Sequence, residues 1–338
     1  MSAATTPAAK VFFSRHIPYA VDNFRKVLAK SGATDRVEIA FHANESALIS
    51  RAELLSQVQG CTGLFCLLSD RIDAELLDCA GPSLKVVSTM SVGYNHIDVD
   101  ACRARNVRVG YTPGVLDVST AETAVALTFA AKRRLFECAE SARNGEWGLW
   151  QPFQYCGTDV SDCTVGVIGL GRIGSTYARM MKLGFNCKVI YTGPREKPEF
   201  VAALGGDVEF VDMDTLLKRS DIVSMHLPLN DATRHAFNAE SFAKMKPEAV
   251  FINTSRGEVV NQDALVDALK SRKIAAAGID VTTPEPLPPS HELFALENCV
   301  VLPHIGSATV KTRRAMADIA VQNLAAGVLG HELPHGVW

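Results

Sequence analysis

Three polar residues that could transfer a proton or hold an anion each follow a short apolar segment. Arg256 follows "AVFINTS", Glu285 follows "AAAGIDVTTP", and His304 follows "CVVLP". Ligands of open parallel sheets bind beyond the carboxyl ends of the strands, so we expect one shared site. Histidine can donate a proton near neutral pH, glutamate can orient the ring, and arginine can hold a carboxylate. This set predicts reduction of a carbonyl group, whose oxygen needs a proton when hydride reaches the carbon.

Each of these residues also has a simpler interpretation. Alone, His304 could be a hydrogen-bonded structural residue, Glu285 a loop charge between two prolines, and Arg256 a solvated charge before glycine. That interpretation requires three coincidences beside a cofactor motif, so we favour the shared site.

The cofactor motif is the stretch "VIGLGRIG". It places Gly169, Gly171 and Gly174 in G-x-G-x-x-G spacing between an apolar run and a helical pattern. The first glycine permits a tight turn, the second lets the backbone approach a pyrophosphate, and the third lets helix and strand pack closely. The helix N-terminus then offers N–H groups to the phosphates. The context therefore predicts dinucleotide binding, with a plain glycine-rich turn as the alternative.

The usual ribose-binding acid is missing about 20 residues further on. In the stretch "VIYTGPREK", residues 189–197, the expected strand runs into Thr-Gly-Pro-Arg, and the first acid is Glu196. A carboxylate would repel a 2′-phosphate, whereas Arg195 and Lys197 could pair with one. We therefore expect NADPH rather than NADH. Solvated loop charges are the alternative, and which of the two cations would contact the phosphate stays open.

The elements that must position these groups form two series. Apolar β-rich runs alternate with helical patterns, which predicts parallel sheets and an α/β fold of two doubly wound units with a cleft between them. The first series is "KVFFS", "VEIAFH", "GLFCLLS", "KVVSTM" and "VRVGY"; the second is "CTVGVIGLG", "KVIYTG", "DIVSMHLP", "AVFINTS", "AAAGIDV" and "CVVLPH". One long helix is expected over residues 116–145, capped by Ser119 or Thr120, and another in the tail after Ser307.

Bulk properties exclude several classes of protein. The chain has 338 residues, which suits about two domains, and a net charge of −3, which argues against a nucleic-acid-binding surface. No apolar run is long enough to span a membrane. Nine scattered cysteines without a CxxC argue against a zinc site or a disulfide framework. The first ten residues are expected to be a tail without a targeting signal, and we expect a cytoplasmic location.

Together, "VIGLGRIG", "INTSRGEVVNQDAL", "AAAGIDVTTPEPLP" and "VLPHIGSAT" resemble the D-2-hydroxyacid dehydrogenases. Within that family, "LLSD", "VVSTMSVGYNHID", "VRVGYTP", "GEWGLWQP" and "VIYTG" resemble the glyoxylate/hydroxypyruvate reductases. The resemblance runs from about Lys10 to about Leu333. It implies a flavodoxin-like substrate domain (residues 1–115 and 305–338), a Rossmann domain (residues 116–304), and a homodimer formed through a loop near residues 140–156.

The resemblance also implies roles for individual residues. His304 would be the acid/base, Glu285 its partner and Arg256 a substrate ligand. Further substrate contacts would come from Leu68, Ser69, the backbone of Val92 and Gly93, Ser307, and Trp150 reaching the neighbouring subunit. Expected cofactor contacts are Thr120, Gly169, Gly171, Arg172, Ile173, Gly174, Gly193, Arg195, Lys197, Leu227, Pro228, Thr254, Asp280 and Gly306.

The expected reaction is NADPH-dependent reduction of glyoxylate and hydroxypyruvate to glycolate and D-glycerate. One alternative is an NADH-linked dehydrogenase of another 2-hydroxy acid, against which the missing acid argues. The other is a cofactor-sensing corepressor-like scaffold. Metal ligands are not expected.

Overall fold

The computed structural model describes residues 9–44 and 47–338, which fall into two compact units. The first unit combines the described chain up to Leu116 with Thr309–Trp338, and the second is Asp117–Ala308. Most of the expected amino-terminal tail, residues 1–8, lies outside the described residues. Because the second boundary follows Ala308, Gly306 and Ser307 belong to the same unit as His304.

The first unit is a five-stranded parallel sheet with strand order β2-β1-β3-β4-β5, the flavodoxin-like order. Its strands are β1 (Ala9–Phe13), β2 (Val37–Phe41), β3 (Gly63–Cys66), β4 (Val86–Thr89) and β5 (Arg108–Gly110). Its helices are α1 (Pro18–Lys30), η1 (Thr34–Arg36), α2 (Arg51–Gln57), α3 (Ala74–Ala80), α4 (Val99–Ala104) and α12 (Val310–Val328).

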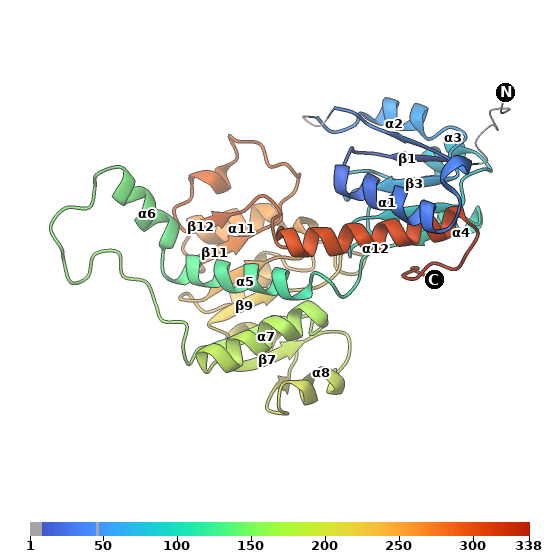
Figure 1. Ribbon diagram of the computed structural model, residues 1–338. Helices are drawn as coiled ribbons and strands as arrows, with labels where there is room; N and C mark the ends of the chain where they lie inside the picture. Colours follow the sequence, from blue (N-terminus) through green and yellow to red (C-terminus); the bar gives the residue numbers. More distant parts are fainter. Residues whose placement is uncertain (1–8, 45–46) are drawn as a thin grey trace, which may run out of the picture. The chain divides into compact units, whose positions relative to one another are not determined.

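Helix α12 returns the end of the chain to the first unit, where it packs on α1, β3 and β4 (Figure 1). Its approach to the sheet depends on Gly327, because a Cβ there would lie 2.4 Å from the Cβ of Val86. Thr309 caps the helix by accepting a hydrogen bond from the backbone N–H of Thr312.

The second unit is a seven-stranded parallel sheet with order β12-β11-β10-β9-β6-β7-β8, the Rossmann arrangement extended by one strand. Its strands are β6 (Thr164–Ile168), β7 (Lys188–Thr192), β8 (Glu209–Phe210), β9 (Ile222–Met225), β10 (Val250–Asn253), β11 (Ala276–Ile279) and β12 (Cys299–Val301). Its helices are α5 (Asp117–Lys132), α6 (Leu135–Arg143), α7 (Arg172–Phe185), α8 (Pro198–Ala203), α9 (Met213–Arg219), α10 (Ala239–Lys244), η2 (Gly257–Val259), α11 (Gln262–Lys270) and η3 (Glu292–Ala295).

The prediction of two doubly wound α/β units is confirmed. Strands β3, β4, β9, β10 and β11 are buried at every position, as expected for parallel sheets with both faces covered by helices. Each predicted strand is present, and the two-residue strand β8 was not predicted.

The prediction of a single helix over residues 116–145 is wrong. Helix α5 already begins at Asp117, so neither Ser119 nor Thr120 caps it, and it ends at Lys132. Arg134 then takes a left-handed conformation (φ 54°) before α6 starts. The break coincides with a distant contact, because the carbonyl of Lys132 accepts a hydrogen bond from the backbone N–H of Thr158 at 2.9 Å.

Among the described residues, no helix combines the length and the apolar character that crossing a membrane requires.

Candidate active site in the second unit

The structure brings His304 and Glu285 together at the carboxyl edge of the seven-stranded sheet. Nδ1 of His304 lies 2.8 Å from Oε2 of Glu285. The side chains remain 25% and 30% exposed, so a ligand can reach them. Although burial alone would raise the pKa of Glu285, the hydrogen bond and charge of His304 bring it below its usual value. The ionised carboxylate therefore fixes the imidazole with Nε2 left for another partner.

Asp280 shapes the turn that carries His304. Its two carboxylate oxygens accept hydrogen bonds from the backbone N–H groups of Ile305 and Gly306, each at 2.7 Å. The backbone carbonyl of Asp280 accepts the N–H of His304 at 2.9 Å, and His304 adopts φ 55°. Burial raises the pKa of Asp280 despite these hydrogen bonds. The carboxylate of Asp280 therefore stabilises this turn, and its expected contact with the cofactor stays a prediction.

Gln262 clamps the loop that carries Glu285, a role that the sequence analysis missed. The side-chain amide of Gln262 donates to the carbonyl of Thr283 at 2.6 Å and accepts its N–H at 2.8 Å. One residue earlier, the N–H of Thr282 donates to Oε1 of Glu285 at 3.0 Å. Gln262 is the first residue of α11, where a polar residue is ordinary, so no sequence signal marks it.

Arg256 lies on a loop packed tightly against the same segment. A Cβ on Gly257 would fall 2.1 Å from the carbonyl oxygen of Thr282, so only glycine permits this approach. Burial lowers the pKa of Arg256 below its usual range, and the carboxylates of Glu285 and Glu258 act in the opposite direction. One guanidinium nitrogen donates to the carbonyl of Ser255 at 2.7 Å. The structure therefore places Arg256 in the electrostatic neighbourhood of the His304–Glu285 pair.

The glycine motif forms the expected strand–turn–helix. Gly169 has φ 96°, and Gly171 precedes the first residue of α7. A Cβ on Gly174 would lie 2.2 Å from the carbonyl oxygen of Gly169, so this glycine serves internal packing. A Cβ on Gly171 would meet no atom within 4 Å. Internal packing therefore does not require glycine at 171, and the open space there fits a pyrophosphate at the helix N-terminus.

The loop after β7 carries no acid at the ribose position. Thr192 ends the strand, and the side chain of Arg195 is exposed with no partner among the described residues. Nζ of Lys197 lies 4.0 Å from Oε1 of Glu199, and its backbone N–H donates to the hydroxyl of Tyr191 at 3.0 Å. Both cations could meet a phosphate, and Arg195 is the less engaged of the two.

Other predicted cofactor positions line the same sheet edge. The Thr254 hydroxyl, just beyond β10, is buried without a hydrogen-bond partner in the described structure, which fits a ligand contact. Leu227 and Pro228 follow β9. Gly306 packs against Thr120, with the nearest side-chain carbon 3.3 Å from the position that a Cβ would take. Nε of Arg172 forms an ion pair with the carboxylate of Asp117 at 3.4 Å. Ile173 lies in the first turn of α7, and Gly193 follows the last residue of β7.

Four predicted substrate ligands belong to the first unit. Leu68 and Ser69 follow β3 and are exposed, and Val92 and Gly93 follow β4. The hydroxyl of Ser91 donates to the carbonyl of Gly93 at 2.7 Å, which fixes the turn. Their contact with substrate stays a prediction, as does that of Ser307, which is half-buried just past His304.

The segment after α6 carries exposed apolar side chains. Trp147, Leu149, Trp150 and Phe153 are 69%, 88%, 80% and 89% exposed. Figure 1 shows this segment extending away from the rest of its unit. Contiguous exposed apolar groups of this kind mark an interaction surface.

Among the described residues, no cluster of three or more His, Cys, Asp or Glu side chains is placed to hold a metal ion.

Comparison with known proteins identifies the family of the chain. Residues 125–306 match the model of the D-isomer specific 2-hydroxyacid dehydrogenase NAD binding domain. A glyoxylate reductase/hydroxypyruvate reductase from Homo sapiens is 48% identical, covering 96% of both chains, and one from Mus musculus is 49% identical, covering 86% of this chain and 88% of the mouse protein. The crystal structure of the TT0316 protein from Thermus thermophilus superposes with a TM-score of 0.87 at 41% identity, covering 97% of this chain and all of that one. The chain belongs to the D-isomer-specific 2-hydroxyacid dehydrogenases, a family of oxidoreductases with a nicotinamide-dinucleotide-binding domain.

Proposed function

We propose that this protein reduces glyoxylate and hydroxypyruvate to glycolate and D-glycerate with NADPH. The observation that carries the proposal is the 2.8 Å contact between His304 and Glu285 at the carboxyl edge of a dinucleotide-binding sheet. The substrates follow from the activity for which the relatives in human and mouse are named.

A bound nicotinamide would supply hydride to C2 of the oxo acid. His304 would donate a proton to the carbonyl oxygen, because that oxygen gains negative charge as hydride arrives. Glu285 would hold the imidazole ring and stabilise the imidazolium form before transfer. Arg256 would pair with the substrate carboxylate and carbonyl and so fix the reacting face. The family resemblance supports five further proposed substrate contacts: Leu68, Ser69, Val92, Gly93 and Ser307.

The preference for NADPH rests on the loop after β7. The strand ends without an acid that would repel a 2′-phosphate, and Arg195 is exposed and unpaired among the described residues. We assign the phosphate contact to Arg195, with Lys197 as the weaker contributor because Glu199 lies near its ammonium group.

We further propose that the exposed apolar segment around Trp147 and Trp150 pairs two copies of the chain into a homodimer. Trp150 is then the residue offered to the neighbouring subunit's site. Size-exclusion chromatography with light scattering tests this: a dimer is expected, and Trp147→Ser with Trp150→Ser should weaken it.

Initial rates with each cofactor and each oxo acid test the function. Both oxo acids should be reduced, and NADPH should give the higher kcat/KM. Faster turnover with NADH would overturn the cofactor assignment. Absence of NADPH oxidation with either acid would favour a cofactor-sensing scaffold instead.

A further inference from the structure

Three reactive side chains meet in the second unit away from the candidate active site. Lys132 is the last residue of α5, and Cys163 and Cys187 immediately precede β6 and β7. The two cysteines are at the amino ends of strands, whereas the candidate active-site residues follow the carboxyl ends of strands. All nine cysteines are free thiols in the structure.

The two cysteines are side by side on neighbouring strands. Thr164 and Lys188, the next residues along, are register partners in the parallel pair β6–β7. The N–H of Lys188 donates to the carbonyl of Cys163 at 3.0 Å. The preceding residues are also paired, because the side-chain amide of Asn186 donates to the carboxylate of Asp162 at 2.6 Å. The register is therefore fixed on both sides of the cysteine pair.

The two thiols also point to the same place. Sγ of Cys163 donates to the carbonyl of Asp159 at 3.3 Å, and Sγ of Cys187 to that of Val160 at 3.2 Å. These acceptors belong to consecutive residues, so both sulfur atoms lie against one short piece of backbone. Neighbouring strands run roughly 4.8 Å apart, within the range of about 4.4 to 6.8 Å that disulfides span between Cα atoms.

Lys132 adds a cation to this pair. The residue is only 6% exposed, and its ammonium donates to Sγ of Cys163 at 3.4 Å. A lysine beside a partly exposed thiol is a setting in which cysteines react with peroxides. The charge of Lys132 also helps to lower the pKa of Asp221, a neighbouring carboxylate.

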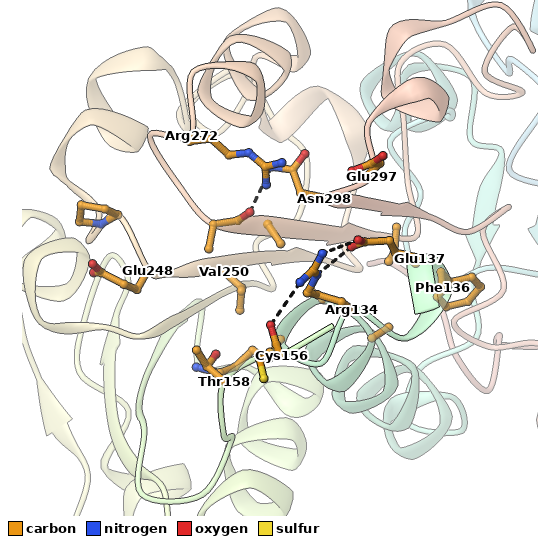
Figure 2. A pocket seen from close by; sticks show the side chains of 18 residues that line it. Arg134, Phe136, Glu137, Cys156, Thr158, Glu248, Val250, Arg272, Glu297 and Asn298 are labelled. Atoms are coloured by element: carbon orange, nitrogen blue, oxygen red, sulfur yellow. Dashed lines mark hydrogen bonds and ion pairs between the residues drawn. The ribbon is translucent and has the colours of Figure 1, made fainter. Parts of the chain in front are cut away.

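A cavity lies on the Lys132 side of this cluster. It measures about 500 Å³ and lies at the amino ends of β10, β11 and β12, and Lys132 is one of its lining residues. Figure 2 shows the cavity with Val250 and Asn298 among the labelled side chains. Cys163 is half-buried and Cys187 only 3% exposed, so a small oxidant would meet Cys163 first.

We propose that Cys163 and Cys187, with Lys132, form a peroxide-reactive dithiol site that closes to a reversible disulfide. The sulfur of Cys163 attacks one oxygen of hydrogen peroxide, the O–O bond breaks, and one water leaves, giving a sulfenic acid. The sulfur of Cys187 then attacks the sulfur of Cys163, the S–S bond forms, and the S–O bond breaks. The hydroxyl group departs with the proton of the Cys187 thiol as a second water. Two thiols are oxidised by two electrons while one peroxide is reduced to two waters.

The two cysteines divide these roles by their burial. Burial raises the pKa of the Cys187 thiol to about 11, so this residue keeps its proton until the S–S bond forms. Cys163 lies beside the ammonium group of Lys132 and is the more exposed of the two thiols, so it reacts first.

The test is peptide mapping of the folded full chain after exposure to hydrogen peroxide. Remaining thiols are alkylated, the protein is digested without reductant, and linked peptides are identified by mass. The expected product joins the peptides of Cys163 and Cys187, is lighter than their sum by two hydrogen atoms, and disappears with dithiothreitol. Cys163→Ser and Cys187→Ser should each abolish it. Cys79→Ser, which removes a half-buried thiol of α3 in the first unit, should leave it unchanged.

Lys132→Met should slow formation of the cross-link about tenfold, and Lys132→Arg, which keeps the charge, should retain most of the rate. The two serine variants carry the test even if Lys132→Met fails to fold. The proposal is overturned if both cysteines stay alkylatable at a peroxide dose that oxidises Cys156. It is equally overturned if Cys163 advances to sulfinic acid without a cross-link.

Discussion

Two loops of the second unit follow strands at the same edge of the sheet, yet they are held very differently. The loop after β11 carries Glu285 and is tied down by Gln262, by the N–H of Thr282 and by the contact with His304. The loop after β7 carries Arg195, whose side chain has no partner among the described residues, and Lys197, whose nearest acid is 4.0 Å away.

The difference in how the two loops are held matches the different roles proposed for them, proton transfer and phosphate recognition. The proposed proton transfer would need atoms within about half an ångström of their working positions, and the Glu285 loop is fixed by several independent contacts. Recognition of a phosphate charge depends mainly on which residue type is present and tolerates a mobile side chain. Substitutions in the first loop should therefore damage chemistry through geometry, and substitutions in the second should change preference at little cost in stability.

Glu285→Gln should have the largest effect of these substitutions. It keeps the size of the side chain but removes the charge that holds imidazolium, so kcat should fall about 100-fold. Steady-state kinetics with NADPH measures this. The matched control is Glu196→Gln in the exposed loop, which should change kcat less than about twofold; similar losses in both variants would erase the contrast.

The second prediction concerns the pH dependence of stability and rests on His226, which is half-buried beside the glycine-rich loop. Desolvation lowers its pKa from 6.5 to about 3, and its Nε2 lies 2.8 Å from the hydroxyl of Ser224. The unfolded chain binds a proton at this residue below pH 6.5, whereas the folded chain does not until about pH 3. The free energy of unfolding should therefore fall between those values as the pH drops, by up to about 1.4 kcal/mol per unit.

Urea denaturation at several pH values measures the slope. His226→Gln removes the titrating group and should flatten it relative to the parent protein. An unchanged slope would show that His226 does not carry the effect.

Gln262→Leu should lower kcat about tenfold. It removes both hydrogen bonds to Thr283 and should also cost about 1 to 3 kcal/mol of unfolding free energy, because buried backbone groups lose their partners. Gln262→Glu keeps one acceptor for the N–H of Thr283 and should recover part of the loss. The deciding measurement is the pH profile of kcat: a positioning role shifts its acid limb, and a purely structural role changes stability alone.

Arg195→Ala should have the smallest effect, a rise in KM for NADPH of about fivefold with KM for NADH unchanged. The unfolding free energy should change by less than about 0.5 kcal/mol, because the side chain contacts little. Lys197→Ala should raise KM for NADPH less. The reverse ranking would move the phosphate contact to Lys197.

Much of this architecture could be predicted from the sequence. Apolar runs separated by helical patterns predicted both sheets, and glycine spacing located the turn at Gly169. Residues just past strand ends predicted the His304–Glu285 pair, because parallel topology brings such ends to one edge. These features depend on local pattern and on rules of topology.

Other features depend on contacts between residues distant in the chain. The helix ends at Lys132, where the carbonyl accepts a hydrogen bond from the N–H of Thr158. No glycine or proline near Lys132 predicts this helix end. Gln262 is one polar residue among many until the fold places it against Thr283. The hydrogen bonds from two backbone N–H groups to the carboxylate of Asp280 likewise cannot be predicted from the sequence.

The central claim is that His304, held by Glu285, supplies the proton for reduction of a 2-oxo acid. Its most direct test pairs turnover of glyoxylate by His304→Ala with the affinity of that variant for NADPH, measured by fluorescence titration. The variant should lose at least about 100-fold in kcat, with the Kd for NADPH within about twofold of the parent value. Turnover near that of the parent, or an equal loss of NADPH binding, would contradict it.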